Sequence, residues 1–539
     1  PMSLYSVALS GLNAGQIALS VTSNNITNVK SAGYNRQIVA LNEASVGGGV
    51  TTGNIERQFN KYVTQQYNAA KSSEAGLSAY QNQIGQIDSL LADSDSGLSV
   101  MIQKFFGSLQ TLASAPADPA TRQGVIGSAE NLTAQFRSMD SYLSDMQKGV
   151  NGEVADQVTQ INNTTKQIAS LNREISLAKA KTGVAPNALL DQRDDLVSSL
   201  SQRINVRVTE QDSGTYNISF SNGLSLVSGF ESNKLEAMAS NEDPTRTTVG
   251  FRDSANNLVP VRESTIQNGE LGGVLKFRDE TLDAAQNRLG QLAVSLASAV
   301  NTQHAAGVDL NGNPGQDFFS IGQPTSFSNA KNTSTAYFDG VYSDASNLGS
   351  SDYAITYSAT TGYDVKDKTT GQSIGTFPVG SPTLTFGGIT LTMNGTPADG
   401  DKFLIKPVAT AARSFDSNIT DPVDIAAGDA TSTGAGDNRN ALALYKLQST
   451  AFMKGGSTVN QAYASLVNEI GNKAQIVKVN QATQQTMSEQ LLAVQQSDSG
   501  VNLDEEATNL LRYQQYYQAS ARIIDTATSI MDTIIGLRN

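Results

Sequence analysis

The sequence contains no cysteine and no tryptophan, and its single histidine is His304. Without cysteine the chain has no disulfide, no thiolate metal ligand and no cysteine nucleophile. With one histidine it has no His–His metal pair, and a histidine-dependent triad would rest on this residue alone. His304 ends a predicted helix just before Gly307, where a positive charge complements the helix dipole. We therefore expect His304 to have a structural role at the helix end rather than a catalytic or metal-binding role.

Positive charge is also scarce, with 37 Lys and Arg against 50 Asp and Glu and a net charge of −13. A nucleic-acid surface needs clustered Lys and Arg, so nucleic acid is not expected as a partner. The sequence has no apolar run of about 18 residues, so no membrane insertion is expected. It also lacks the charged, apolar and small-residue regions of a secretory signal, so general secretory export is not expected either.

The phosphate-binding patterns GxxxxGK[ST] and GxGxxG are absent, so no nucleotide site is predicted. Residues 309–317 place Asp309, Asn311 and Asn313 at calcium-loop spacing, but Pro314 replaces the required glycine and Ser320 the bidentate carboxylate. We interpret this segment as an Asx-rich turn.

Two acidic groups, at 194–195 and 504–506, are the remaining candidates for carboxylate chemistry. The first is expected on a helix surface beside Arg193, and the second in the first turn of the last helix, where negative charge is favoured. No catalytic residue, cofactor or metal site is therefore predicted.

Apolar residues recur at helical spacing over 3–27, 61–112, 125–175, 271–304 and 440–496. The pattern over 125–175 covers about fifty residues, or a rod roughly 75 Å long at about 1.5 Å per residue. Gly149 and Gly152 lie inside it and are candidate positions for a kink. After Gln202 the pattern changes to strict alternation, and Asn222-Gly223 predicts a hairpin turn. A second alternating region spans roughly 310–410, and the Gly-rich stretch 46–53 predicts a loop.

The predicted fold class is α+β with several domains: a long antiparallel, coiled-coil-like helical bundle from both halves of the chain, with inserted β-rich modules. Residues 1–60 and 497–539 would form a terminal helical assembly region, and residues 61–202, 271–304 and 422–496 the bundle. Residues 203–270 and 305–421 would form the first and second β-rich modules.

The terminal helices carry faces that the chain itself leaves uncovered. Two neighbouring apolar stripes run along 501–539, too wide for one dimer seam, and 3–27 sets a stripe of large residues beside one of Ala and Gly. Such helices are marginal alone, so we expect other chains to complete them. The N-terminal interface candidates are Leu4, Tyr5, Ala8, Leu9, Leu12, Ala18 and Leu19. The C-terminal candidates are Leu503, Leu510, Tyr513, Tyr517, Ile523, Ile524, Met531 and Ile534.

The segment SNNITNVKSAGYNRQ, residues 23–37, resembles the signature of flagellar axial proteins, which include rod, hook and hook-associated subunits. Four further blocks, at 105–143, 187–206, 271–312 and 499–524, are together similar to the family of the first hook-associated protein. The central strand-rich part matches more loosely. The family motif maps onto Asn24, Asn25, Asn28, Gly33, Tyr34 and Arg36.

This resemblance implies a structural, non-enzymatic subunit that joins the flagellar hook to the filament outside the cell. It implies contacts with copies of itself in a ring or helical tier, with hook subunits and with the second junction protein. It also implies export by the flagellar type III apparatus with an export chaperone. Another axial subunit, either the second junction protein or a flagellin, remains an alternative. So does a secreted adhesin or carbohydrate-active protein whose β-rich modules hold a cleft with converging carboxylates or aromatics.

Overall fold

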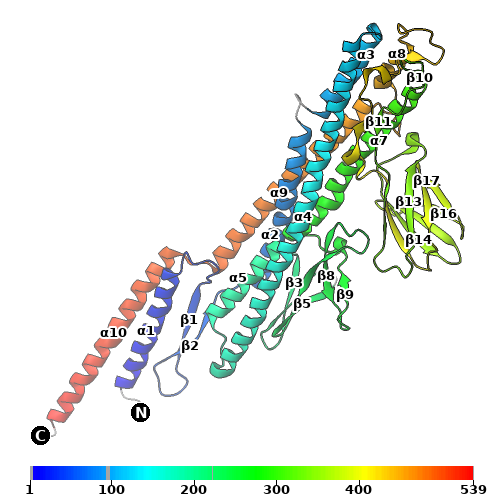
Figure 1. Ribbon diagram of the computed structural model, residues 1–539. Coiled ribbons are helices and arrows are strands. Elements are labelled where there is room, and N and C mark those ends of the chain that lie inside the picture. The colour runs from blue at the N-terminus through cyan, green and yellow to red at the C-terminus, as the bar shows by residue number, and fades with distance from the viewer. Residues whose placement is uncertain (1–3, 93–96, 221–222, 538–539) are drawn as a thin grey trace.

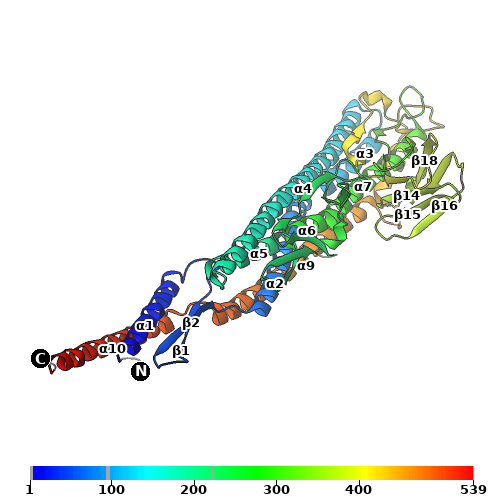
Figure 2. The ribbon, with the colours of Figure 1, turned by 90° about the horizontal axis from the view of Figure 1, so that it is seen from below.

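A computed structural model describes residues 4–92, 97–220 and 223–537. The molecule is elongated, and both ends of the described chain lie at the same end of it (Figure 1). Helices form a long bundle, and strand-rich parts lie beside it (Figures 1 and 2). The predicted fold class, a bundle built by both halves of the chain with inserted β-rich parts, is confirmed.

The terminal part consists of two helices and a hairpin. Helices α1 (Leu4–Thr27) and α10 (Leu503–Gly536) contact each other, and β1 (Gln37–Glu43) pairs antiparallel with β2 (Val50–Arg57). At the hairpin tip residues 47–49 are glycines with φ of +83°, +79° and +95°, a conformation that glycine adopts without a steric penalty. The predicted Gly-rich loop is thus the turn of a hairpin. Helix α10 starts where the Asn502 side chain accepts the backbone N–H groups of Asp504 and Glu505.

The bundle contains the remaining long helices of the described residues. These are α2 (Lys61–Leu91), α3 (Leu98–Ser114), α4 (Pro119–Thr182), α5 (Asn187–Arg203), α6 (Gly269–Phe277), α7 (Asp283–Ala305), α8 (Arg439–Lys446) and α9 (Val459–Ser499). A π-helical turn, Arg278–Leu282, joins α6 to α7.

Helices from the two ends of the chain pair from the outside inward. Helix α1 contacts α10, α2 contacts α9, and α3 contacts α8. The α2–α9 pair is antiparallel, because Gln495 hydrogen-bonds to Thr64 whereas Gln481, earlier in α9, hydrogen-bonds to Ser78, later in α2. The two halves of the chain therefore build one bundle.

Three helix boundaries differ from the sequence pattern. The expected helix 61–112 ends at Leu91 and restarts at Leu98, and the expected helix 440–496 is interrupted between Lys446 and Val459. Helix α4, in contrast, is longer than expected and has 64 residues, about 96 Å at about 1.5 Å per residue. Gly149 and Gly152 do not interrupt it, because an interior glycine costs only about 1 kcal/mol and buried neighbours such as Val150 and Val154 offset this.

The first β-rich part lies between α5 and α6. It has one sheet in the order β3-β4-β5-β6 and another in the order β7-β8-β9. Strands β4 and β5 pair antiparallel around the expected turn, where Gly223 has φ +87° and Asn222 lies outside the described residues. The strands are β3 (Val206–Glu210), β4 (Tyr216–Phe220), β5 (Leu224–Ser228), β6 (Glu231–Ser232), β7 (Leu235–Ala239), β8 (Thr247–Arg252) and β9 (Leu258–Pro260).

The second β-rich part follows α7 and contains sheets in the orders β12-β19-β14-β15-β16 and β13-β18-β17. Two short strand pairs, β10 with β21 and β11 with β20, flank these sheets in the sequence. Strands β10 and β11 precede the sheets, and β20 and β21 follow them. The strands are β10 (Gly307–Val308), β11 (Phe319–Ser320), β12 (Thr325–Ser328), β13 (Tyr337–Tyr342), β14 (Tyr353–Ser358), β15 (Gly362–Asp367), β16 (Ser373–Phe377), β17 (Thr383–Phe386), β18 (Ile389–Asn394), β19 (Lys402–Lys406), β20 (Asp416–Ser417) and β21 (Gly428–Asp429).

The main core runs along the bundle and includes residues from both edges of the second β-rich part. Phe318 and Phe319 pack edge-on or tilted against Phe105 of α3, and Phe415 packs against Phe136 of α4. All five rings are buried. Some residues within 305–421 thus belong to the bundle core, and a second core is built mainly from β13 to β19 and includes Val294 of α7.

Asparagine side chains of α4 hold the first β-rich part in place. Asn162 donates to the backbone oxygen of Leu235 (2.8 Å) and accepts its N–H (2.9 Å). Asn172 makes the same pair of bonds with Tyr216, and Asn151 bonds to the backbone of residues 245 and 247. Each side-chain amide offers one donor and one acceptor to the backbone of the strand, as the backbone of a neighbouring strand would.

Helix α1 is the one helix of the described residues that is long and apolar enough to cross a membrane, by length and composition alone. The sequence has no continuous apolar run of this length, but the average hydropathy of α1 is high enough for a membrane span. A single helix of this kind near a chain start is weak evidence for a membrane span. Within its apolar 18-residue stretch, 33% is buried inside the protein.

Candidate assembly surface

Small residues let α1 and α10 approach closely. Ala8, Gly11, Ala14, Gly15 and Ala18 are buried on α1. A Cβ atom on Gly11 would lie 2.8 Å from the Ser520 hydroxyl oxygen, and one on Gly15 would lie 3.1 Å from the ring of Tyr516. Ala8 and Ala18, which were predicted to form an interface between chains, are buried within the single chain, so neither is exposed to a neighbouring subunit in this structure.

The large apolar residues of the two helices remain accessible. Leu4, Tyr5 and Leu9 on α1, and Leu503, Ile523, Met531 and Ile534 on α10, are exposed, with Ile534 at 56%. The other candidates, Leu12, Leu19, Leu510, Tyr513, Tyr517 and Ile524, are partly buried. We call the exposed candidates, together with Leu511 of α10 and Leu537 directly after it, the terminal apolar surface.

Two exposed leucines of the terminal apolar surface were not predicted. Leu511 is 60% exposed and Leu537 is 83% exposed. Leu511 falls outside both apolar stripes of α10, so helical periodicity gave no signal for it, and Leu537 follows the last stripe residue. The uncovered surface is therefore wider than the stripes suggest.

The family-motif residues form a connection between the ends of the chain. The buried Asn25 amide accepts the Tyr34 hydroxyl (2.7 Å) and the Gln37 N–H (2.9 Å), and it donates to the Gln37 carbonyl (2.8 Å) and to Glu506 (3.3 Å). Burial, and then the nearby carboxylates of Asp191 and Glu506, raise the pKa of Tyr34 to about 12. Tyr34 therefore stays a neutral donor.

The remaining motif residues shape or extend this connection. Gly33 has φ +75°, and a Cβ there would lie 3.0 Å from Asp195, so the site requires glycine. Asn28 donates to the side-chain oxygen (2.9 Å) and the backbone oxygen (3.0 Å) of Asn24 at the exposed end of α1.

Arg36 joins the hairpin to the start of α10. Its Nε lies 2.5 Å from Glu506, which is 1% exposed, and its Nη1 lies 3.1 Å from Glu505. The Arg36 N–H also donates to the Ser499 carbonyl at 2.8 Å. The acidic residues of the first α10 turn lie where the sequence predicted, but Glu506 is a buried ion-pair partner rather than a surface residue.

A second polar cluster fastens the terminal part to α5 of the bundle. Asn35 donates through its side chain to Asp191 (2.7 Å), and Arg57 pairs with Asp191 (2.9 Å) and Asp194 (2.6 Å). Asp194 also accepts the Tyr216 hydroxyl at 2.7 Å. The prediction that Asp194 lies on a helix surface was wrong, because the hairpin and the first β-rich part cover it; Asp195 is exposed.

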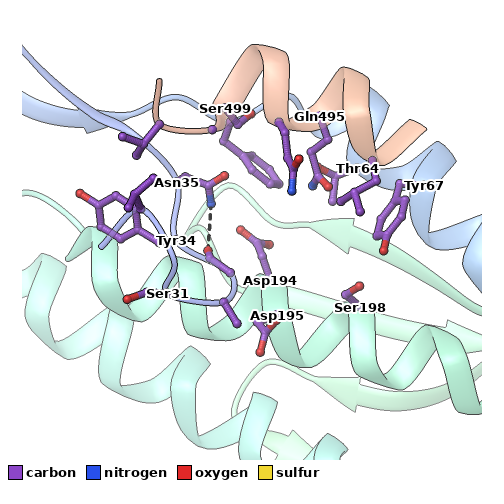
Figure 3. A pocket seen from close by; sticks show the side chains of 18 of the residues that line it. Ser31, Tyr34, Asn35, Thr64, Tyr67, Asp194, Asp195, Ser198, Gln495 and Ser499 are labelled. Carbon is purple, nitrogen blue, oxygen red and sulfur yellow. Dashed lines mark hydrogen bonds between the residues drawn. The ribbon is translucent and has the colours of Figure 1, made fainter. Parts of the chain in front are cut away.

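A polar cavity of about 620 Å³ opens at this joint (Figure 3). Its lining comes from the loop after α1, from α2, from α5 and from the end of α9, and it includes Asn35, Tyr67, Asp194, Asp195, Ser198 and Ser499. Asp194 is engaged by Arg57, so the two adjacent carboxylates do not form a free acid–base pair. We find a joint between two parts of the chain here rather than a reactive centre.

A second cavity, of about 780 Å³, lies between α7, α9 and the second β-rich part and contains several carboxylates. Asp283 pairs with Arg246 and accepts Gln147 (2.8 Å), and Asp367 accepts the N–H groups of Thr369 and Thr370. Asp283 thus joins elements of the fold and Asp367 caps a local turn, so neither is a free carboxylate of the kind that glycoside hydrolysis needs.

His304 has a different role from the predicted one. It lies at the end of α7 but is fully buried, and desolvation lowers its pKa. Its Nε2 accepts the Ala426 N–H at 2.9 Å, so Nδ1 is the donor to the Gln316 carbonyl at 2.6 Å. The imidazole is therefore a neutral link in the core, and the prediction of a cation at the helix end was wrong.

The candidate calcium loop is an Asx turn, as predicted. The Asp309 carboxylate accepts the N–H groups of Asn311 (2.8 Å) and Asn313 (2.9 Å), which leaves it occupied by backbone donors. Within the described residues no cluster of three or more His, Asp or Glu side chains is arranged to hold a metal ion.

Models of flagellar protein families match most of the chain. The flagellar hook-associated protein FlgK helical domain matches residues 84–319, and the D2-like domain of flagellar hook-associated protein 1 matches residues 327–407. The flagella basal body rod protein model matches residues 6–34, and the C-terminal model of the basal body rod FlgEFG proteins matches residues 495–537.

Full-length relatives and a solved structure agree with these matches. The chain is 44% identical over 546 residues to flagellar hook-associated protein 1 of Escherichia coli, covering 99% of this chain and 100% of that one. It is 41% identical to the protein of the same name from Salmonella typhimurium, with the same coverage. The flagellar hook junction protein FlgK of Burkholderia pseudomallei superposes with a TM-score of 0.76 and 30% identity over 80% of this chain and 100% of that one. The chain belongs to the family of flagellar hook-associated protein 1.

Proposed function

We propose that the chain is a structural subunit of the bacterial flagellum that joins the hook to the filament, and that its terminal helices carry the assembly contacts. The observation that carries this proposal is the terminal apolar surface on α1 and α10. Large exposed apolar side chains gathered on two helices that pack together mark an interaction site. Packing between subunits, rather than catalysis, is the mechanism.

We infer that the contacts are head-to-tail. A junction subunit has to match a hook subunit on one side and the second junction protein on the other, beside copies of itself in a ring or tier. Heterologous contacts of this kind use different patches on the two sides of each subunit. The width of the terminal apolar surface, with exposed residues on both terminal helices, supports contacts to more than one neighbour.

We infer further that the subunit leaves the cell through the flagellar type III apparatus with an export chaperone, and that its ends become fully ordered only on assembly. The exposed apolar residues of α10 support the second point, because few neighbours hold this helix in the isolated chain. In isolated protein, residues 1–30 and 505–539 should exchange amide hydrogens faster than α4. Equal protection of both would contradict delayed ordering.

We also propose a division into four parts: a terminal assembly region, a bundle and two β-rich modules. The second module covers fewer residues than the predicted range 305–421. Pairing of Thr325 with Lys406 closes this second module, while residues outside the pair, such as Phe319, pack in the bundle.

The test is a charge placed on the terminal apolar surface. Ile534→Asp buries an unpaired carboxylate wherever this surface packs, at a cost of several kcal/mol. We expect it to abolish filament attachment and swimming, with the thermal unfolding of the isolated bundle unchanged. Ser529→Asp, an exposed polar position on the same helix, is the matched control and should leave motility intact. Normal swimming of the Ile534→Asp strain would refute the role of this surface.

A further inference from the structure

Helix α9 carries an exposed apolar stripe that is separate from the terminal apolar surface. Ile476, Val479, Met487 and Val494 are 55%, 52%, 47% and 46% exposed. Their spacings of three, eight and seven residues are close to whole helical turns, so they share one side of the helix. Thr483 and Gln490 lie on the same side and leave the stripe without charge.

Another side of this part of α9 is already packed against α2. Val477 and Ser488 are buried, and Ser488 hydrogen-bonds to Glu74 of α2 at 2.6 Å. The stripe spans residues 476–494, about 27 Å at about 1.5 Å per residue, and lies on a side of α9 that this packing leaves open. An apolar helix face of this length is normally covered. The isolated chain leaves it exposed.

An uncharged groove lies on the same bundle. It has a volume of about 570 Å³ and is lined by Asn82, Gly85, Gln86, Ser89 and Leu90 of α2 and by Tyr142 of α4. A Cβ atom on Gly85 would meet no atom within 4 Å, so the groove is open at this position. All lining residues are uncharged, and Tyr142 is 37% exposed.

We propose that the α9 stripe of one copy packs into the α2–α4 groove of the next copy, so that the bundle joins neighbouring subunits in addition to the terminal helices. This inference rests on the proposed function, because it needs copies arranged side by side. Neither surface carries charge in a chain of net charge −13, so their contact desolvates no ion and matches the depletion of charge in interface cores.

Two further features favour a second copy as the occupant. Only residues 500–502 separate α9 from α10 (Figure 1), so the stripe lies on the helix next to the one that carries most of the terminal apolar surface. The stripe and the groove are also different patches of one chain, which is what a repeating head-to-tail contact requires.

The test is photo-crosslinking in motile cells. p-Benzoylphenylalanine is placed at Met487, and in parallel at the exposed, off-stripe position Glu489 as the matched control. On illumination of assembled junctions we expect an adduct of twice the chain mass from position 487 only. Its crosslinked peptide should come from residues 82–90 or from the α4 segment around Tyr142. If the substitution at Met487 prevents filament attachment, the label is moved to Gln86, and the expected peptide then comes from 476–494.

The other outcomes overturn the inference. These are an adduct with another protein, an adduct with α1 or α10 of a second copy, equal adducts from positions 487 and 489, or no adduct in a swimming strain. Swimming without an adduct refutes the α9 contact and leaves the proposed function standing. Normal swimming of Ile534→Asp refutes the terminal surface instead, so the two failures are distinguishable.

Discussion

The ion pair between Arg36 and Glu506 should hold the start of α10 to the hairpin, and Arg36→Met tests this. The Glu506 side chain is 1% exposed and that of Arg36 13%. Removing the arginine leaves a buried carboxylate with only the amide of Asn25 at 3.3 Å. Breaking one partner of a buried pair typically costs about 3–5 kcal/mol. The partial exposure of Arg36 places the expected loss at the lower end, about 3 kcal/mol.

A loss of about 3 kcal/mol corresponds to a roughly hundredfold increase in local opening. Quench-flow hydrogen exchange read by mass spectrometry should show it as faster exchange over residues 503–512, with α4 unchanged as the internal reference. Glu505→Gln is the matched control, because Glu505 is 55% exposed and exposed pairs contribute only about 0–1 kcal/mol.

The double variant Arg36→Met/Glu506→Met decides whether the reason is electrostatic. It removes both charges, so it should recover most of the protection lost in the single variant. If the double variant exchanges as fast as Arg36→Met, the buried carboxylate is not the cause and the reasoning fails.

Three further predictions follow from contacts elsewhere in the fold. Asn162→Ala should destabilise β7 by about 1–3 kcal/mol, since it leaves backbone groups of Leu235 unpaired; faster exchange there checks it, with the exposed Asn163→Ala as control. Burial raises the pKa of Asp352 to about 6 from 3.8, so its contribution favours folding at low pH and is lost as pH rises through about 4 to 6. Asp352→Asn should therefore raise the free energy of unfolding at pH 8 by about 1–2 kcal/mol but not at pH 3.5; an equal gain at both pH values, measured by denaturant unfolding, would contradict this. Replacing 326–405 by a short Gly/Ser linker should leave the bundle folded, because Thr325 and Lys406 are paired neighbours; circular dichroism melting checks this, and loss of the helical transition would show that the bundle needs the module.

Local and periodic sequence patterns predicted much of the fold. Helical spacing predicted α1, α4, α7 and α10, because an amphipathic helix repeats its contacts every turn and the repeat is visible in the sequence. Alternation predicted the two strand-rich regions, and the Asn-Gly pair marked the β4–β5 turn. The Ala and Gly stripe of the first helix likewise indicated a close helix partner, since only small side chains permit such an approach.

Contacts between distant segments had no such signal. Which helix would cover the small-residue stripe of α1 was decided by α10, so Ala8 and Ala18 became intrachain core. Burial of Asp194 and Glu506 depends on Arg57 and Arg36 arriving from another part of the chain. His304 is neutral because α7 ends inside the core rather than in solvent.

The sequence by itself determined the positions of the main helical segments and of the two strand-rich regions, the absence of thiol chemistry, and the apolar character of both ends. The tertiary structure alone decided which of those apolar residues stay exposed, where the charged residues find partners, and that α9 offers a further uncharged surface. The physical reason is that periodicity records the local face of an element, whereas burial and charge pairing depend on what the rest of the chain places against that face.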